Sequence, residues 1–295
     1  MRILLLANAK SYHTRRWAVS LANSGKRVLL VSLDTPNKWI RELYTGNGVE
    51  LRTLSIDTEH SRTTFTKIVY LKSVPQLRKL IVDFKPDIVH AHYATSYGLL
   101  GSLCGFHPFI VSAWGSDVMD FPLQSPLHRL LIRFNLRCAD KLLATSESIA
   151  DETRKYTDKK VTITPFGVDL EQFSPTPIES PFGEGAIVVG CLKPVEPVYG
   201  HTTLIRALSL ARGMRPDLPL RGLFVGGGSH EQAARVLCHQ VGVEESVLFM
   251  GERCPSEVPF FQRMQTISTV LSRREGFGVV AIEATLARFP SLPPA

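Results

Sequence analysis

Residues 161–190, VTITPFGVDLEQFSPTPIESPFGEGAIVVG, contain the change of pattern that divides this chain. A short apolar strand over residues 161–163 is followed by residues 169–185, which hold three prolines and two glycines but few aliphatic side chains. Such clusters between regular segments are typical of loops. A new apolar strand then begins over residues 186–190. We therefore predict a first domain over residues 1–168, a linker over 169–185 and a second domain from residue 186 onward.

Apolar strands alternate with helical stretches on both sides of this linker. Before it, we expect a helix over 14–23 and strands over residues 2–7, 27–32, 88–92, 109–113, 141–145 and 161–163. After it, we expect strands over 186–190, 221–225 and 246–250, and helices over 201–212, 230–241 and 256–265. This alternation is typical of α/β domains with parallel sheets, whose ligands bind beyond the carboxyl ends of the strands. Two such domains would leave a cleft between them for a ligand.

The composition favours a cytoplasmic globular protein with an anionic partner. The 295 residues carry a net charge of +7, with 23 Lys and Arg against 14 Asp and Glu up to residue 168, and 11 against 13 beyond it. A basic first domain favours an anionic partner, although we predict no nucleic acid among the partners. The apolar start is too short for a signal peptide, and no later run is long enough to span a membrane. Five scattered cysteines argue against a disulfide framework or a structural zinc site, and we predict no metal.

Four motifs lie within this α/β pattern: ANAKSYHTRRW at 7–17, AWGSDV at 113–118, ITPFGVDLEQF at 163–173 and SRREGFGVVAIEA at 272–284. Together they resemble glycosyltransferase family 4 (glycosyl transferases group 1), whose signature is two glutamates separated by seven residues. That spacing alone is weak evidence, but the surrounding motifs make the set specific. The resemblance runs from Met1 to about Ala284. It implies the GT-B fold, two Rossmann-like domains facing across a cleft, with the second one incomplete over residues 186–284.

The resemblance also implies an activity. A hexosyltransferase of this family moves a sugar from a nucleotide-sugar donor, UDP- or GDP-linked, to a glycan or lipid-linked acceptor. It retains configuration and needs no metal, and it uses no cofactor besides the donor. Two alternatives remain open: a truncated remnant that binds a ligand or partner without turnover, and a sugar-nucleotide epimerase of the same fold. An NAD-dependent oxidoreductase is disfavoured because the chain lacks the GxGxxG fingerprint.

The resemblance places the donor site around the two spaced glutamates. It implies that Glu275 holds the donor-sugar hydroxyls and Glu283 the ribose diol, since a carboxylate can accept two hydrogen bonds from neighbouring hydroxyls. The backbone amides of Gly276, Phe277 and Gly278 come just before a helix and can face an anion. The alternative is a solvated acidic pair at the start of a helix.

A basic loop supplies the expected contact to the diphosphate. Lys193, within GCLKPVEPVYG at 190–200, resembles the first of two family cations, and Val198 stands where the second would be. Arg273 or Arg274 is a conjectural replacement. We expect Gly227 on the nucleotide side of the donor site, although a plain strand-to-helix turn explains that glycine almost as well.

Acceptor chemistry has three candidate residues. Trp114 stands where many family members have a histidine, so we consider Asp117, His13 and His92 instead. Asp117 could accept a proton or hold an acceptor hydroxyl, or it could simply cap a turn. Each histidine lies at or beyond the end of a predicted strand and is expected to face the cleft, but a lone histidine is more often structural.

A basic stripe suggests membrane contact, and the end of the chain departs from the family. Arg129, Arg133, Arg137 and Lys141 recur every four positions, so a helix here could lie on anionic lipid at the inner membrane face, although a solvated helix is favoured. Residues 285–295, TLARFPSLPPA, lack the family's continuation, and their prolines disfavour a helix. We expect an aberrant tail from a frameshift or truncated gene model, and weak or absent activity in this chain.

Overall fold

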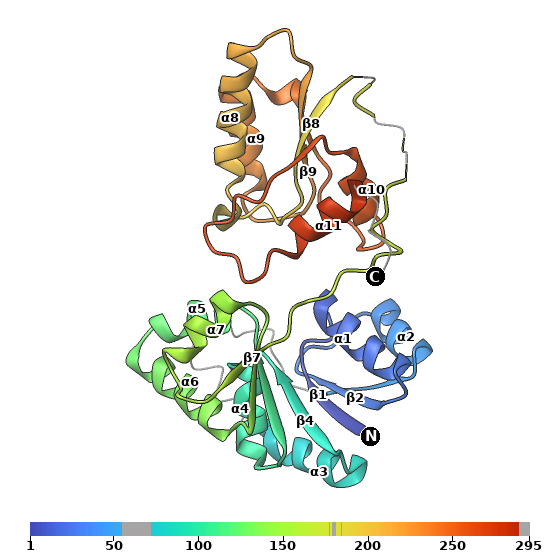
Figure 1. Cartoon of the computed structure of the whole chain (residues 1–295), viewed down its shortest axis with the longest axis vertical. Helices are drawn as coiled ribbons and strands as arrows, with labels where there is room; N and C mark the ends of the chain where they lie inside the picture. Colours follow the sequence, from blue (N-terminus) through green and yellow to red (C-terminus); the bar gives the residue numbers. More distant parts are fainter. Residues whose placement is uncertain (55–71, 177, 179–180, 184, 289–295) are drawn as a thin grey trace, which may run out of the picture. The chain divides into compact units, whose positions relative to one another are not determined.

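The computed structural model describes residues 1–54, 72–176, 178, 181–183 and 185–288. The chain divides into two compact units (Figure 1). The first unit comprises residues 1–166 and the second unit begins at Gly167. None of the helices in these described ranges is both long enough and apolar enough to cross a lipid bilayer.

The first unit is built on a parallel sheet with the strand order β3-β2-β1-β4-β5-β6-β7. Its strands are β1 (Arg2–Leu6), β2 (Arg27–Ser32), β3 (Val49–Thr53), β4 (Ile88–His92), β5 (Phe109–Ala113), β6 (Lys141–Ala144) and β7 (Val161–Ile163). Its helices are α1 (Tyr12–Asn23), α2 (Lys38–Gly46), α3 (Val74–Phe84), α4 (Ser96–Cys104), α5 (Ser116–Met119), the 3-10 turn η2 (Phe121–Leu123), α6 (Pro126–Cys138) and α7 (Glu147–Arg154).

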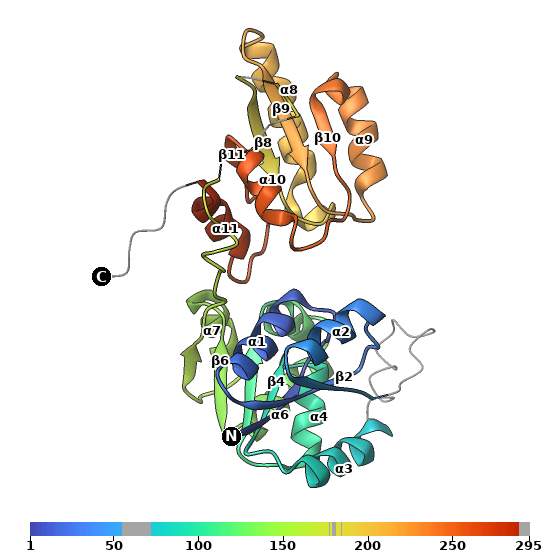
Figure 2. The ribbon, with the colours of Figure 1, turned by 90° about the vertical axis from the view of Figure 1, so that its right-hand side faces the viewer.

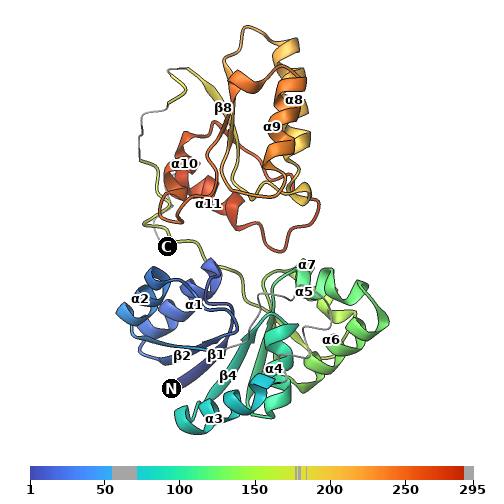
Figure 3. The same ribbon diagram turned by 180° about the vertical axis from the view of Figure 1, so that it is seen from behind.

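Alternation along the strands supplies two apolar faces to this sheet. Ile3 and Leu5 of β1 pack with α1 and α2 on one face. Leu4 and Leu6 pack on the other face, in the core formed with α3, α4, α6 and α7 (Figure 3). Because helices cover both faces, every strand side chain of β1 beyond Arg2 is buried, as in other doubly wound sheets. The strand order reverses between β1 and β4, so loops on either side of this point diverge and leave space for a ligand.

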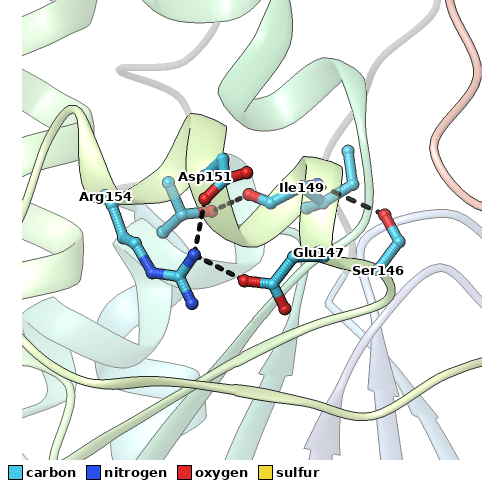
Figure 4. Close-up of polar contacts among 6 residues, drawn as sticks. Ser146, Glu147, Ile149, Asp151 and Arg154 are labelled. Atoms are coloured by element: carbon cyan, nitrogen blue, oxygen red, sulfur yellow. Dashed lines mark hydrogen bonds and ion pairs between the residues drawn. The ribbon is translucent and has the colours of Figure 1, made fainter.

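Helix α7 illustrates how the sequence begins and stabilises an element. Ser146 Oγ accepts a hydrogen bond from Ile149 N at 3.2 Å and so caps the helix. Arg154 Nη1 donates to Glu147 Oε1 at 2.7 Å and to Asp151 Oδ1 at 2.6 Å (Figure 4). An acidic residue in the first turn and a basic one in the last also suit the helix dipole. The helix packs against α5, which carries Asp117.

The second unit has a smaller parallel sheet with the order β10-β9-β8-β11 (Figure 2). Its strands are β8 (Ile187–Cys191), β9 (Leu220–Phe224), β10 (Val247–Phe249) and β11 (Ile267–Ser268). Its helical segments are η3 (Pro197–Tyr199), α8 (His201–Met214), α9 (Glu231–Gln240), η4 (Glu244–Ser246), α10 (Val258–Met264) and α11 (Val279–Arg288). One core lies between the sheet and α8 and α9, and another between the sheet and α10, with Val280 of α11 packed against it.

The end of the chain differs from the expected tail at residues 285–295. Helix α11 continues through Thr285 to Arg288, so the first four of those residues are helical. Residues 289–295, which hold the three prolines of the expected tail, lie outside the described part of the chain.

Candidate functional site

An ion pair at the carboxyl edge of the second sheet joins two residues that are far apart in the sequence. Lys193 comes two residues after β8, and its Nζ lies 2.8 Å from Oε2 of Glu275 in the loop before α11. Ser272 Oγ donates to the same carboxylate oxygen at 3.0 Å. Lys193 Nζ also lies 5.4 Å from the centre of the Tyr199 ring. The lysine side chain is only 13% exposed and that of Glu275 32%, so solvent screens this pair weakly.

Backbone contacts hold the loops that carry the pair. Arg273 N donates to Val198 O at 2.9 Å, which ties the segment before Glu275 to the turn after Lys193. Gly200 has a φ of 74°, and a Cβ there would lie 2.6 Å from Leu271 O. Only glycine tolerates this approach, so the basic loop and the acidic loop are packed directly on each other.

The turn at residues 226–228 supports the Lys193 loop from the other side. A Cβ on Gly226 would lie 2.4 Å from Lys193 O, and one on Gly228 would lie 2.3 Å from Val195 O. Val195 N donates to Gly227 O at 3.1 Å. This close backbone packing explains why residues 226 and 228 are glycines. It agrees with the plain strand-to-helix turn that the sequence analysis gave as the alternative to a nucleotide contact. Any contact of Gly227 with a nucleotide stays a prediction.

Glu196 fixes the same turn through its side chain. Its carboxylate accepts hydrogen bonds from Ser229 N and Ser229 Oγ, both at 2.7 Å. These bonds lower the pKa of Glu196 below its usual value, so the carboxylate is ionised under physiological conditions. Sequence reasoning did not select Glu196 or Ser272. The sequence signal that could have identified them was their position close to Lys193 and Glu275 in the same motifs.

The other predicted donor residues surround α11. Gly278 has a φ of 74° and precedes the first helical residue, Val279, so residues 276–278 form the turn that leads into the helix. Glu283 lies one turn further along and is 5% exposed. The second unit therefore brings Lys193, Glu275 and the 276–278 turn to one edge, with Glu283 buried in the adjoining helix.

The first unit has a pocket of about 410 Å³ at its strand-order reversal. Residues following β1, β2, β4 and β5 contribute to its wall, together with the start of α1 and α4. The lining residues are Asn8, Ser11, Thr14, Leu33, Asp34, His92, Tyr93, Thr95, Ser96, Tyr97 and Trp114. Of the three acceptor-side candidates, only His92 is in this wall.

His92 is a buried residue whose two ring nitrogens have no hydrogen-bond partner among the described residues. Its ring centre lies 4.6 Å from that of Trp114 and 4.6 Å from that of His90. Burial, with a smaller effect of His90, lowers the pKa of His92 well below its usual value. The ring is therefore neutral at pH 7 and has one donor and one acceptor to offer. His13, by contrast, stacks on Phe166 with ring centres 4.0 Å apart.

Asp117 connects the loops that form the pocket wall. It is 1% exposed, and its carboxylate accepts hydrogen bonds from Ala94 N at 2.7 Å, Gly115 N at 2.8 Å and Trp114 N at 3.2 Å. Burial raises the pKa of this carboxyl group, and the backbone hydrogen bonds oppose that rise. Because its oxygens already accept hydrogen bonds from backbone amides, this geometry favours a positioning role for Asp117. The sequence analysis had left such a role open, as the capping of a turn.

Groups of three or more His, Cys, Asp or Glu side chains suited to a metal ion are absent from the described ranges. The arrangement consists instead of one partly buried ion pair with a glycine-rich turn in the second unit, and one polar and aromatic pocket in the first.

Family comparisons match both units. A family model described as Glycosyl transferase 4-like matches residues 2–146, and one described as Glycosyl transferases group 1 matches residues 175–292. D-inositol 3-phosphate glycosyltransferase of Jonesia denitrificans is 28% identical over 235 residues, which cover 69% of this chain and 54% of the relative. A GDP-mannose-dependent alpha-(1-6)-phosphatidylinositol monomannoside mannosyltransferase of Mycobacterium tuberculosis is 31% identical over 140 residues, 43% of this chain and 36% of the relative. The chain thus spans about half or less of the length of these curated relatives.

Solved structures resemble this chain over most of its length at low sequence identity. Anabaena Alr3699/HepE in complex with UDP and glucose gives a TM-score of 0.75 at 16% identity, covering 97% of this chain and 78% of that one. Sucrose-phosphate synthase from Thermosynechococcus elongatus gives 0.75 at 17% identity, covering 96% and 78%. At such identities the likeness establishes the fold.

Proposed function

We propose, because the chain belongs to the GT-B glycosyltransferases, that it takes part in sugar transfer from a nucleotide-sugar donor to a glycan or lipid-linked acceptor. The donor would be linked to UDP or GDP. The single observation that carries the proposal is the ion pair between Lys193 and Glu275 beside the turn at 276–278.

The chemistry of this pair suits a departing nucleoside diphosphate. Lys193 can form charge-assisted hydrogen bonds to the diphosphate oxygens, and the amides before α11 add a second source of positive potential. These groups stabilise the charge that develops on the leaving group, and we propose that they do so without a metal ion. Glu275 would then accept hydrogen bonds from the donor sugar and Glu283 from the ribose, with retention of configuration.

Nucleotide sugars are expected to stabilise the protein against heat. A ligand that binds only the folded state raises the melting temperature as its concentration increases. The measurement is a thermal-shift titration with UDP-glucose, GDP-mannose and related donors, with NAD as the control dinucleotide. Equal stabilisation by NAD, or none by any donor, would contradict the proposal.

Turnover assays separate the alternatives. Transfer or hydrolysis of a stabilising donor supports an enzyme, whereas binding without turnover supports a non-catalytic remnant. If NMR instead shows that the donor sugar changes into its epimer in the absence of an acceptor, the protein is an epimerase.

We also propose peripheral contact with anionic lipid at the inner membrane face, through α6. Leu127, Leu130 and Phe134 are 59%, 64% and 40% exposed and lie on one side of this helix. Arg129 and Arg133 are also exposed, next to this apolar strip. A helix with this composition can insert its apolar side chains at the lipid boundary while arginine attracts anionic headgroups.

Arg133→Gln is expected to weaken binding to phosphatidylglycerol vesicles about fivefold, since a basic side chain near an anionic surface contributes roughly 1 kcal/mol. Co-sedimentation at two salt concentrations measures this, and Lys79→Gln on exposed α3 is the matched control. Equal binding of wild type to neutral and anionic vesicles, or no binding to either, would reject membrane contact through α6.

A further inference from the structure

The pocket of the first unit combines three kinds of side chain around one space. Hydroxyl and amide groups can donate and accept hydrogen bonds, aromatic rings offer flat apolar surfaces, and one carboxylate adds negative charge. The polar neutral members are Asn8, Ser11, Thr14, Thr95 and Ser96, and the aromatic members are Tyr93, Tyr97 and Trp114. A sugar or cyclitol ring has the matching features, because hydroxyls surround its edge and C–H groups cover its faces.

Two buried polar side chains in the wall have no hydrogen-bond partner among the described residues. Thr14 is fully buried, and its Oγ1 makes no hydrogen bond with any described residue. His92 is 1% exposed, and both of its ring nitrogens are likewise unpaired. Buried polar groups in proteins are nearly always hydrogen-bonded, so two unsatisfied groups in a pocket wall favour a ligand with hydroxyls.

Asp34 is the one acidic residue among the described residues that line this wall. It comes two residues after β2 and is half-buried. Hydrogen bonds with Ser32 fix its backbone: Ser32 Oγ donates to Asp34 O at 2.9 Å and lies 3.2 Å from Asp34 N. A carboxylate held here can accept hydrogen bonds from two neighbouring hydroxyls of a ring, and it repels a phosphate group at the same distance.

We propose that this pocket selects an uncharged, hydroxyl-rich ring, a terminal sugar or cyclitol without phosphate, and that Asp34 is the residue that determines this specificity. The inference rests on the proposed function, because it names the class of acceptor that a sugar transferase would use. Thr14 and His92 bond the buried hydroxyls of the ring, while Trp114 and the tyrosines pack on its faces.

Ligand-observed NMR and calorimetry on the full chain test this selection. The neutral probes are methyl α-D-mannopyranoside, methyl α-D-glucopyranoside and myo-inositol, and the anionic probes are mannose 6-phosphate and myo-inositol 1-phosphate. We expect at least one neutral probe to bind about tenfold more tightly than its phosphorylated counterpart, since the Asp34 carboxylate accepts hydrogen bonds from ring hydroxyls but repels a phosphate. Asp34→Asn should weaken neutral binding about tenfold and narrow the difference between the two classes.

Asp83→Asn on the exposed surface of α3 is the matched control and should change neither class. If Asp34→Asn fails to fold, the affinities of the wild-type protein for neutral and phosphorylated rings still test the selection. Equal or tighter binding of the phosphorylated rings, or no binding of any neutral ring, would overturn the inference. If the protein prefers neutral rings but binds no nucleotide-sugar donor, the proposed function is wrong and the inference about the pocket stands. If it binds a donor but does not prefer neutral rings, the role of Asp34 is wrong and the proposed function stands.

Discussion

Gly226→Ala is expected to lower the free energy of unfolding of the second unit by roughly 3 kcal/mol or more, and to weaken nucleotide-sugar binding at least tenfold. Gly226 has a φ of 138°, and its new Cβ would lie 2.4 Å from the carbonyl oxygen of Lys193 and 2.8 Å from its carbonyl carbon. These are backbone atoms, which cannot move aside as the end of a flexible side chain can. The substitution must therefore push the Lys193 loop away from the turn at 226–228, and Lys193 with it.

Gly213→Ala is the matched control for this substitution. Gly213 lies in α8 of the same unit, and a Cβ there would have no atom within 4 Å. Alanine favours a helix over glycine, so stability should stay the same or rise by up to about 1 kcal/mol. Urea denaturation followed by far-ultraviolet circular dichroism compares the free energies of unfolding of the two variants. Calorimetry measures their affinity for the donor. A Gly226→Ala protein as stable as the control would show that the packing of the two loops is unimportant.

The α/β pattern was predictable because buried parallel strands are continuously apolar. The strand expected at 186–190 is β8 at Ile187–Cys191, and the helix expected at 201–212 is α8 at His201–Met214. Strand β3, VELRT, was missed because Glu50 and Arg52 interrupt its apolar character. It lies at the edge of the sheet and buries only Val49 and Leu51 in the core, so alternation rather than a continuous run was its signal.

The candidate sites were predictable only as far as motifs reach. Motif resemblance selected Lys193 and Glu275, but their direct contact depends on the packing of three loops, which spacing along the chain does not encode. Asp34, for which we propose a role in specificity, was not selected although it follows an apolar strand, where ligand-binding residues of such sheets occur. His13 and Asp117 were selected for their residue types. The structure shows His13 stacked on Phe166 and Asp117 bonded to backbone amides, contacts that only the fold creates.

Lys193→Met is expected to weaken binding of a UDP- or GDP-sugar by roughly 10- to 100-fold, because a charge-assisted hydrogen bond to phosphate contributes about 1.5–3 kcal/mol. Val198 stands where a second cation was expected, so we expect Lys193 to carry more of the phosphate charge in this chain. Calorimetry at two salt concentrations measures the loss, which should shrink at high salt. Arg206→Gln, on exposed α8, removes a positive charge elsewhere in the same unit and should leave affinity unchanged. Unchanged donor affinity in Lys193→Met would remove the lysine from the proposed site.

Glu275→Gln distinguishes a donor site from a merely structural ion pair. Glu275 holds Lys193 at 2.8 Å, so a diphosphate must compete with the carboxylate for the ammonium group. The amide removes that competitor and the nearby negative charge, and free UDP or GDP should therefore bind a few-fold more tightly. The corresponding nucleotide sugar should bind more weakly, because the amide replaces the proposed charge-assisted hydrogen bonds of Glu275 to the sugar with weaker neutral ones. A purely structural pair predicts that both ligands change in the same direction, and the double variant Lys193→Met, Glu275→Gln should abolish the gain for the free diphosphate.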